Sequence, residues 1–362
     1  MALILTFLGK GGSGCSTVAI ATAKKLALAG SRVLLVSQDL TPVLTTLLGT
    51  PVNSSPTEVA SNLQVVSLQS AQLLSQGWED VKDLEAKYLR SPTLKNVYGQ
   101  ELGILPGMDG ALALNSLREY DKSGKYDVII YDGDSALNTL RMFGIPEIFS
   151  WYVRRFRQIF TESDVGKALS PFVQPITSAI LNVSWSADDL ANTQANDILE
   201  AGKAALGDGQ RVAAYLVTTE DELAIASAKY FWGGAQQVGL TVKGVILNQE
   251  QGNNPLAAEF DPLKVSNLPQ RSGDNWQPLM DALPDFFGES QVPKPVTIDL
   301  AARQVKVFLP GFAKNQVKLT QYGPELTIEA GDQRRNIELP SPLAGQSVKG
   351  AKFQNHYLIV SL

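Results

Sequence analysis

The fold of this chain is decided by Gly9-Lys10-Gly11-Gly12-Ser13-Gly14-Cys15-Ser16-Thr17, a loop with four glycines in nine residues. The apolar run Ala2–Leu8, typical of a buried strand, precedes the loop, and the helix-like segment Thr17–Ala29 follows it. This order places free backbone N–H groups at the beginning of a helix, where the helix dipole also favours negative charge. The stretch therefore predicts an α/β domain with an anion site at its first loop.

The same loop matches the phosphate-binding pattern G-x-x-x-x-G-K-[ST] at every fixed position except one. Cys15 stands where the pattern has the lysine that contacts phosphates, while Lys10 is present at the start of the loop. Glycines let the backbone N–H groups surround a phosphate. The alternative is a tight strand-to-helix turn that binds no ligand, and so dense a glycine pattern disfavours it.

The loop resembles the deviant phosphate-binding loop K-G-G-x-G-K-[ST]-T of the arsenite-pump ATPase family, which includes the tail-anchored-protein-targeting ATPases. The resemblance implies that a homodimer binds ATP or ADP with Mg²⁺. It assigns the nucleotide contacts to residues 9–17, with Ser16 as a Mg²⁺ ligand and Thr17 on the α-phosphate. Lys10 is implied to be catalytic, because it would reach the phosphates bound by the other subunit.

Five short apolar runs, separated by helical patterns, predict the strands of a doubly wound, mostly parallel sheet. They are Ala2–Leu8, Arg32–Ser37, Asp127–Tyr131, Val212–Thr218 and Val242–Leu247. Ligands of such sheets bind at the C-terminal ends of the strands. Polar residues follow four of these runs, namely the loop Lys10–Thr17, Asp39, Asp132 and Asn248. The sequence therefore predicts that they share one site.

Asp39 lies in Ser37-Gln38-Asp39-Leu40-Thr41-Pro42, which is similar to the family's switch I, S-T-D-P-A-H, only at Ser37 and Asp39. A carboxylate here can orient the water that attacks the γ-phosphate, so the resemblance implies a catalytic role for Asp39. The alternative is a helix N-cap, which aspartate also favours.

Asp132 ends a buried strand-like run, where the resemblance implies that it holds Mg²⁺ through water, since Mg²⁺ prefers oxygen ligands and keeps several waters. The segment resembles the family's switch II, D-T-A-P-T-G-H-T-L-R, at Asp132, Thr139, Leu140 and Arg141. The proline, glycine and histidine between these positions are missing. We therefore expect nucleotide state to be coupled to the following helix differently from the family pattern.

Asn248 follows the run Lys243–Leu247 and precedes Gln249, as in a family strand that ends in N-Q. The resemblance implies that Asn248 reads adenine, because its amide offers both a donor and an acceptor to the purine edge. The alternative is an ordinary turn residue.

The chain is predicted to contain an ATPase domain over residues 1–288, with a helical subdomain at about 68–120 and 146–206. A linker is predicted at 289–295, where Gly, Ser and Pro gather. Residues 296–362 read as short alternating strands with turn residues between them, which predicts an all-β sandwich. The order of Leu309-Pro310-Gly311-Phe312 and the strands that follow it resembles an α-crystallin (small heat-shock) domain.

The composition excludes several other classes of protein. The net charge of −5 gives no support for nucleic-acid binding. One cysteine and one histidine exclude an iron–sulfur cluster, a two-histidine zinc site and the C-x-x-C zinc site of the targeting branch. No apolar run approaches the roughly 20 residues of a membrane span. Met1 leads directly into the first strand, so we expect a cytoplasmic protein without stable membrane insertion.

Because Cys15 replaces the lysine of the pattern, we predict that the protein binds nucleotide but hydrolyses it slowly. A lysine at this position stabilises the transition state more than the ground state, so its loss lowers the rate more than the affinity. Two interpretations of the thiol stay open. A cysteine at a helix N-terminus can have a lowered pKa and act as a redox-sensitive residue. It can instead be a small residue that fits a tight loop, which is the favoured interpretation.

The leading function is therefore an ATP-binding homodimer with slow or client-dependent hydrolysis, coupled to binding hydrophobic segments of membrane proteins, as the targeting branch implies. The alternative is a pseudoenzyme that binds nucleotide as a structural ligand and acts as a small-heat-shock-like holdase or scaffold.

Overall fold

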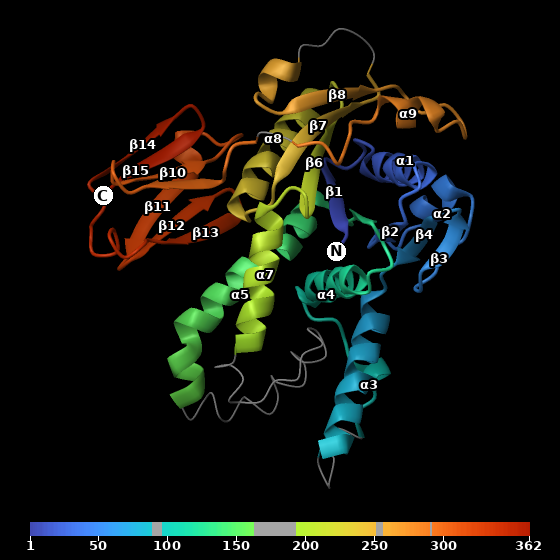
Figure 1. The fold of residues 1–362 in the computed structure, drawn as a ribbon, viewed down its shortest axis with the longest axis horizontal. Helices are drawn as coiled ribbons and strands as arrows, with labels where there is room; N and C mark the ends of the chain where they lie inside the picture. The colour runs from blue at the N-terminus through green and yellow to red at the C-terminus, as the bar shows by residue number, and fades with distance from the viewer. Residues whose placement is uncertain (89–95, 163–192, 251–255, 290–291) are drawn as a thin grey trace.

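A computed structural model describes residues 1–88, 96–162, 193–250, 256–289 and 292–362 (Figure 1). Its largest element is an eight-stranded sheet in the order β3-β4-β2-β5-β1-β6-β7-β8. The strands in that order are Thr57–Ala60, Leu63–Ser67, Val33–Ser37, Val128–Asp132, Leu3–Gly9, Val212–Thr218, Val242–Asn248 and Lys264–Leu268. All neighbours are parallel except β3, which runs antiparallel to β4.

The doubly wound fold is confirmed. All five predicted runs form strands, and each agrees with its predicted bounds to within one residue at either end. The sequence missed β3, β4 and β8. Strand β1 lies in the middle of the sheet between β5 and β6, so the loop that follows it opens at the centre of the C-terminal edge.

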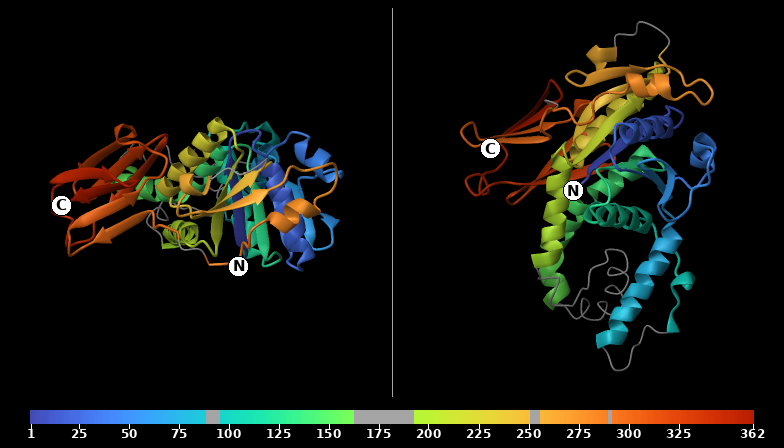
Figure 2. Two further views of the ribbon diagram at one scale, coloured as in Figure 1. Left: turned by 90° about the horizontal axis from the view of Figure 1, so that it is seen from above. Right: turned by 45° about the vertical axis from the view of Figure 1, so that its right-hand side comes forward.

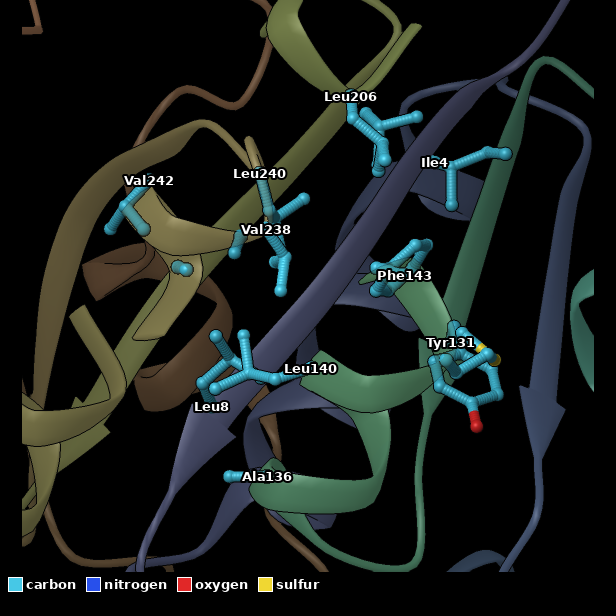
Figure 3. Packing of buried hydrophobic residues seen from close by; sticks show 14 of the residues in the cluster. Ile4, Leu8, Tyr131, Ala136, Leu140, Phe143, Leu206, Val238, Leu240 and Val242 are labelled. Carbon is cyan, nitrogen blue, oxygen red and sulfur yellow. The ribbon is translucent and has the colours of Figure 1, made fainter. Parts of the chain in front are cut away.

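Helices cover both faces of the sheet because β1 buries alternate side chains on opposite sides. Leu3, Leu5 and Phe7 pack against α1 and α9, whereas Ile4 and Leu8 face α4, α5, α7 and α8. Figure 3 shows the second cluster, in which Ile4 and Leu8 lie beside side chains of α5. The helices are α1 (Cys15–Leu28), α2 (Val43–Leu48), α3 (Ser70–Tyr88), α4 (Met108–Lys122), α5 (Ala136–Glu162), α7 (Thr193–Gly207), α8 (Glu222–Gln237) and α9 (Gln277–Ala282).

Three long helices, α3, α5 and α7, project from the sheet in one direction (Figures 1 and 2). The predicted helical segment 68–120 contains α3 and most of α4, while 146–206 contains the second half of α5 and nearly all of α7. Residues 89–95 and 163–192 of these segments lie outside the described residues. No helix within the described ranges is long and apolar enough to cross a membrane.

The predicted C-terminal sandwich is confirmed as an all-β unit. One sheet has the order β14-β15-β10-β9 and the other β11-β12-β13, and every paired strand is antiparallel. Strand β15 is therefore interior, between β14 and β10. The strands are β9 (Val296–Asp299), β10 (Gln304–Phe308), β11 (Val317–Tyr322), β12 (Glu325–Ala330), β13 (Gln333–Glu338), β14 (Gly350–Gln354) and β15 (Tyr357–Ser361).

The sandwich packs beside α8 (Figures 1 and 2). Its own core includes Val305, Val307 and Val360. Phe308 instead belongs to the core of the large sheet, where its ring lies 5.5 Å from that of Trp232 on α8. The two units thus share an apolar contact.

Candidate functional site

The glycine-rich loop turns sharply between β1 and α1. Gly12 and Gly14 have φ values of +87° and +94°, in the left-handed region that favours glycine. The Ser13 N–H donates to the Lys10 carbonyl at 2.9 Å, which closes the turn. Helix α1 begins at Cys15, so the first N–H groups of the helix have no partner within it. This is the geometry of an anion site.

Asn248, the last residue of β7, supports the loop from the side. Its Nδ2 donates to the Ser13 carbonyl at 2.9 Å, and the residue is 2% exposed. A Cβ at Gly14 would lie 2.2 Å from the same Nδ2, so the loop and the amide fit only because Gly14 has no side chain. Asn248 is therefore placed at the site, but its predicted contact with adenine stays a prediction.

Asp132 and Ser16, the two predicted Mg²⁺ ligands, lie together at the end of β5. Burial raises the pKa of Asp132 to about 6, a hydrogen bond with Ser16 opposes the rise, and the negative charge of Asp39 adds to it. A buried carboxyl group with a second carboxylate nearby is stabilised by a cation. One or two carboxylates completed by phosphate oxygens and water are a donor set that suits Mg²⁺. The residues present fit the metal.

Asp39 approaches Asp132 from the segment after β2. Its carboxylate accepts from the Thr41 N–H at 2.8 Å and from the Thr41 hydroxyl at 2.9 Å. The N-cap of α2 is Pro42, so the N-cap alternative for Asp39 is wrong, although Asp39 does fix the turn that leads into the helix. The position remains compatible with its predicted role in orienting water.

A second link between these segments was not predicted. The Gln38 N–H donates to the Asp132 carbonyl at 3.0 Å, and the Tyr131 hydroxyl donates to Gln38 Oε1. These contacts tie the segment carrying Asp39 to the end of β5. No sequence signal identifies them, because they depend on β2 and β5 being neighbours.

Cys15 packs inward at the first turn of α1. Its Sγ lies 3.7 Å from Ser13 Oγ, and a Cβ at Gly9 would lie 2.8 Å from the sulfur. Burial, with a further contribution from the charge of Asp132, raises the pKa of the thiol to about 12. A reactive thiolate requires a lowered pKa, so the raised pKa disfavours the redox hypothesis and favours the small-residue interpretation.

Within the part of the chain that the structure describes, the side chains of Lys10 and Thr17 make no hydrogen bond or ion pair. Lys10 is exposed, and no carboxylate among the described residues pairs with it. Thr17 is half-buried in the first turn of α1. The roles predicted for these two residues, and for Gly9 and Gly11, stay predictions.

The raised pKa of Asp132 predicts a pH-dependent stability. The carboxyl titrates near 3.8 in the unfolded chain and near 6 in the folded protein. Between these pH values the folded state binds more protons than the unfolded state. The contribution of Asp132 to the free energy of unfolding therefore falls as pH rises from about 4 to about 6. Asp132→Asn lacks the titration. Its unfolding free energy relative to wild type should therefore increase by up to ~3 kcal/mol across that window.

Urea unfolding of both proteins between pH 4 and 7.5, in the presence of a chelator, measures this difference. Parallel stability profiles for the two proteins would show that Asp132 ionises normally.

Comparisons with known proteins identify the family of this chain. Residues 2–260 match the anion-transporting ATPase family, and residues 301–362 match an HSP20-like domain found in ArsA. A putative arsenical pump-driving ATPase of Chlorobaculum tepidum is 24% identical and aligns with 98% of this chain and 94% of its own length. A putative arsenical pump-driving ATPase 1 of Aquifex aeolicus is 22% identical, with 99% of each chain covered.

A shorter match is the ATPase GET3 of Malassezia globosa, which is 26% identical over 47% of this chain and 48% of its own length. The family match covers well over half of the 362 residues. The chain therefore belongs to the anion-transporting ATPase family and carries a C-terminal HSP20-like domain.

Proposed function

We propose that this protein binds Mg-ATP at the head of α1 and hydrolyses it slowly. The observation that carries the proposal is the convergence of the loop amides, Ser16 and Asp132 at one edge of the sheet. The N–H groups of residues 9–17 would hold the phosphates, with Thr17 on the α-phosphate. Bound Mg²⁺ would neutralise phosphate charge. Ser16 would contact that ion directly, and Asp132 through water.

The positive charge at the phosphates is incomplete within one copy of the chain, because Cys15 replaces the usual lysine. We propose that Lys10 of a second copy supplies part of it, so the active form is a homodimer. The exposure of Lys10 leaves its ammonium group available for this contact. We also propose that the ATPase domain ends at residue 288, that a linker follows over 289–295, and that the sandwich domain begins at residue 296. The protein is proposed to be cytoplasmic.

Asp39 is proposed to orient the attacking water. In phosphoryl transfer a carboxylate mainly positions the nucleophile, so Asp39→Asn should lower the rate of hydrolysis roughly tenfold or more while ATP still binds. Steady-state phosphate release and calorimetric titration measure the two effects.

The control is Asp134→Asn, an exposed carboxylate two residues beyond Asp132. It should leave hydrolysis near the wild-type rate. Unchanged hydrolysis in Asp39→Asn would remove Asp39 from the proposed mechanism. Failure of the wild-type protein to bind ATP or ADP at millimolar concentration would overturn the proposed function as a whole.

Hydrolysis is proposed to be coupled to binding hydrophobic segments of membrane proteins, as suits a family that includes the ATPase GET3. The HSP20-like domain supports a client with exposed apolar residues. The second candidate, a nucleotide-binding scaffold or holdase, is favoured by Cys15, whose side chain packs inward and offers no charge. Phosphate release measured with and without an apolar peptide separates the two: the scaffold hydrolyses no ATP under either condition.

A further inference from the structure

The sandwich is joined to α8 by a close contact between backbones. A Cβ at Gly233 of α8 would lie 2.3 Å from the Pro310 carbonyl oxygen, and a Cβ at Gly311 would lie 2.2 Å from the Lys229 carbonyl oxygen. The rings of Tyr230 and Phe312 lie 5.5 Å apart, nearly perpendicular. Backbones that approach this closely cannot slide without a clash, so the sandwich and α8 form a rigid joint.

The contacts between the sandwich and α5 are polar. Arg141 pairs with Asp332 at 2.6 Å, and Arg154 pairs with Glu325 at 2.8 Å. Trp151 Nε1 also donates to Glu325 at 3.2 Å. The side chains of Arg141 and Asp332 are 58% and 55% exposed. An exposed pair of this kind contributes little to stability, so the Arg141–Asp332 contact can break and reform at small cost.

Asp332 connects the two helices. Its N–H donates to the Tyr230 hydroxyl of α8 at 3.1 Å, while its carboxylate holds Arg141 of α5. The backbone of Asp332 is thus held against α8, while its carboxylate attracts Arg141 of α5. A shift of α5 would change the Arg141–Asp332 distance without moving the sandwich from α8.

Helix α5 also reaches the candidate site. It begins at Ala136, four residues after Asp132, and Arg141 lies in its second turn. Leu140, next to Arg141, is buried against β1 and α8, where a Cβ at Gly234 would lie 2.9 Å from its Cδ1 (Figure 3). One continuous helix therefore connects the Mg²⁺-site carboxyl with the charged edge of the sandwich.

We propose that Asp332 is a positioning residue for the nucleotide site, acting through Arg141, and that the sandwich and the bound nucleotide are thermodynamically coupled through α5. This inference rests on the proposed nucleotide binding. Coupling is reciprocal: whatever factor the Arg141–Asp332 contact contributes to nucleotide affinity, nucleotide contributes to that contact. The HSP20-like domain is then a sensor of the ATPase site as well as an appended module.

A charge-swap experiment on the full-length chain tests the coupling. Arg141→Asp and Asp332→Arg each place like charges opposite one another, and the double variant restores an opposite pair with reversed polarity. Each single variant should shift the Kd for Mg-ATP, measured by calorimetry, in the same direction by roughly fivefold, the scale of one exposed pair. The double variant should return to within twofold of wild type.

The matched controls are Arg334→Asp and Glu329→Arg. Their pair, at 2.8 Å with side chains 64% and 42% exposed, lies within the sandwich and does not involve α5. These variants change the net charge by the same amounts and should leave the Kd unchanged. Hydrogen exchange of β12 and β13 in the wild type should also change when Mg-ATP is added, and the change should be smaller in Arg141→Asp.

The outcomes separate this inference from the proposed function. If the wild type binds no nucleotide, the proposed function fails and the coupling fails with it. If the wild type binds Mg-ATP but the single variants match the controls, only the coupling is overturned. Single variants that shift the Kd without recovery in the double variant show a purely structural effect and also overturn it.

Discussion

Replacing Cys15 with lysine is expected to raise the rate of ATP hydrolysis by about 100- to 1000-fold. A single charged donor placed at the developing phosphoryl charge is worth about 2.7–4 kcal/mol in the transition state. The loop geometry that would direct such a lysine is already present, since α1 begins at residue 15 and Gly14 has the left-handed conformation. The gain should appear in kcat, with a smaller change in nucleotide affinity.

The lysine cannot occupy the space of the thiol. Sγ lies against Gly9 and Ser13, so a longer side chain has to turn outward toward the phosphates. This change should cost about 1 kcal/mol of stability through the lost packing. Cys15→Ala is the control, because it removes the thiol without adding charge and should hydrolyse ATP at nearly the wild-type rate. Cys15→Ala and Cys15→Lys proteins of equal kcat would contradict the argument that the missing ammonium limits turnover.

Gly14→Ala is expected to lower nucleotide affinity at least 100-fold. The added methyl group would lie 2.2 Å from Asn248 Nδ2 and 3.3 Å from Asn248 Cγ, and the backbone φ of +94° disfavours any side chain. Asn248 would have to move and release the Ser13 carbonyl that it holds. Moving the loop N–H groups away from the phosphates would lose hydrogen bonds to a charged group, worth about 1.5–3 kcal/mol each, so the loss of two such bonds weakens binding at least ~100-fold.

Gly11→Ala is the matched control for folding. A Cβ at Gly11 meets no atom within 4 Å, and its φ is not in the left-handed region. Chemical unfolding should show Gly11→Ala close to wild type and Gly14→Ala less stable by roughly 1–2 kcal/mol, the cost of one left-handed alanine. Calorimetry with ADP measures the affinity. Wild-type affinity in Gly14→Ala would mean that the loop adjusts freely and that Asn248 does not support it.

The sequence predicted the centre of the fold better than its margins. Five interior strands, β1, β2, β5, β6 and β7, are buried along nearly their whole length, so each appears as a continuous apolar run. The sixth interior strand, β4, has only three buried residues, and its shorter apolar run was missed. Strands β3 and β8 are at the edges of the sheet, and their short segments alternate or expose polar residues. Such segments do not differ in sequence from loops, because their pairing depends on a neighbour that is distant in the chain.

The candidate site was likewise predicted only in part. The loop, Asp39, Asp132 and Asn248 could be placed at one edge because parallel strands end together. The pKa of Cys15 was predicted in the wrong direction by the redox hypothesis, which considered the helix dipole and had no information on burial. The contact of Gly233 with Pro310, and of Asp332 with Arg141, could not be predicted, since nothing in the sequence fixes how the sandwich lies on the helices.

The interior position of β15 has a consequence for biosynthesis. Strand β10 pairs with β9 on one side and with β15 on the other, so the hydrogen bonds along its second edge cannot be satisfied until Tyr357–Ser361 has left the ribosome. The large sheet has no such requirement, since β8 ends at Leu268. The nascent protein would therefore carry all eight strands of the large sheet while Phe308, which packs in the core of that sheet, still lacks its neighbour Tyr357. A nonsense mutation before Tyr357 would leave the edges of β10 and β14 exposed and unpaired, and such edges are prone to aggregation.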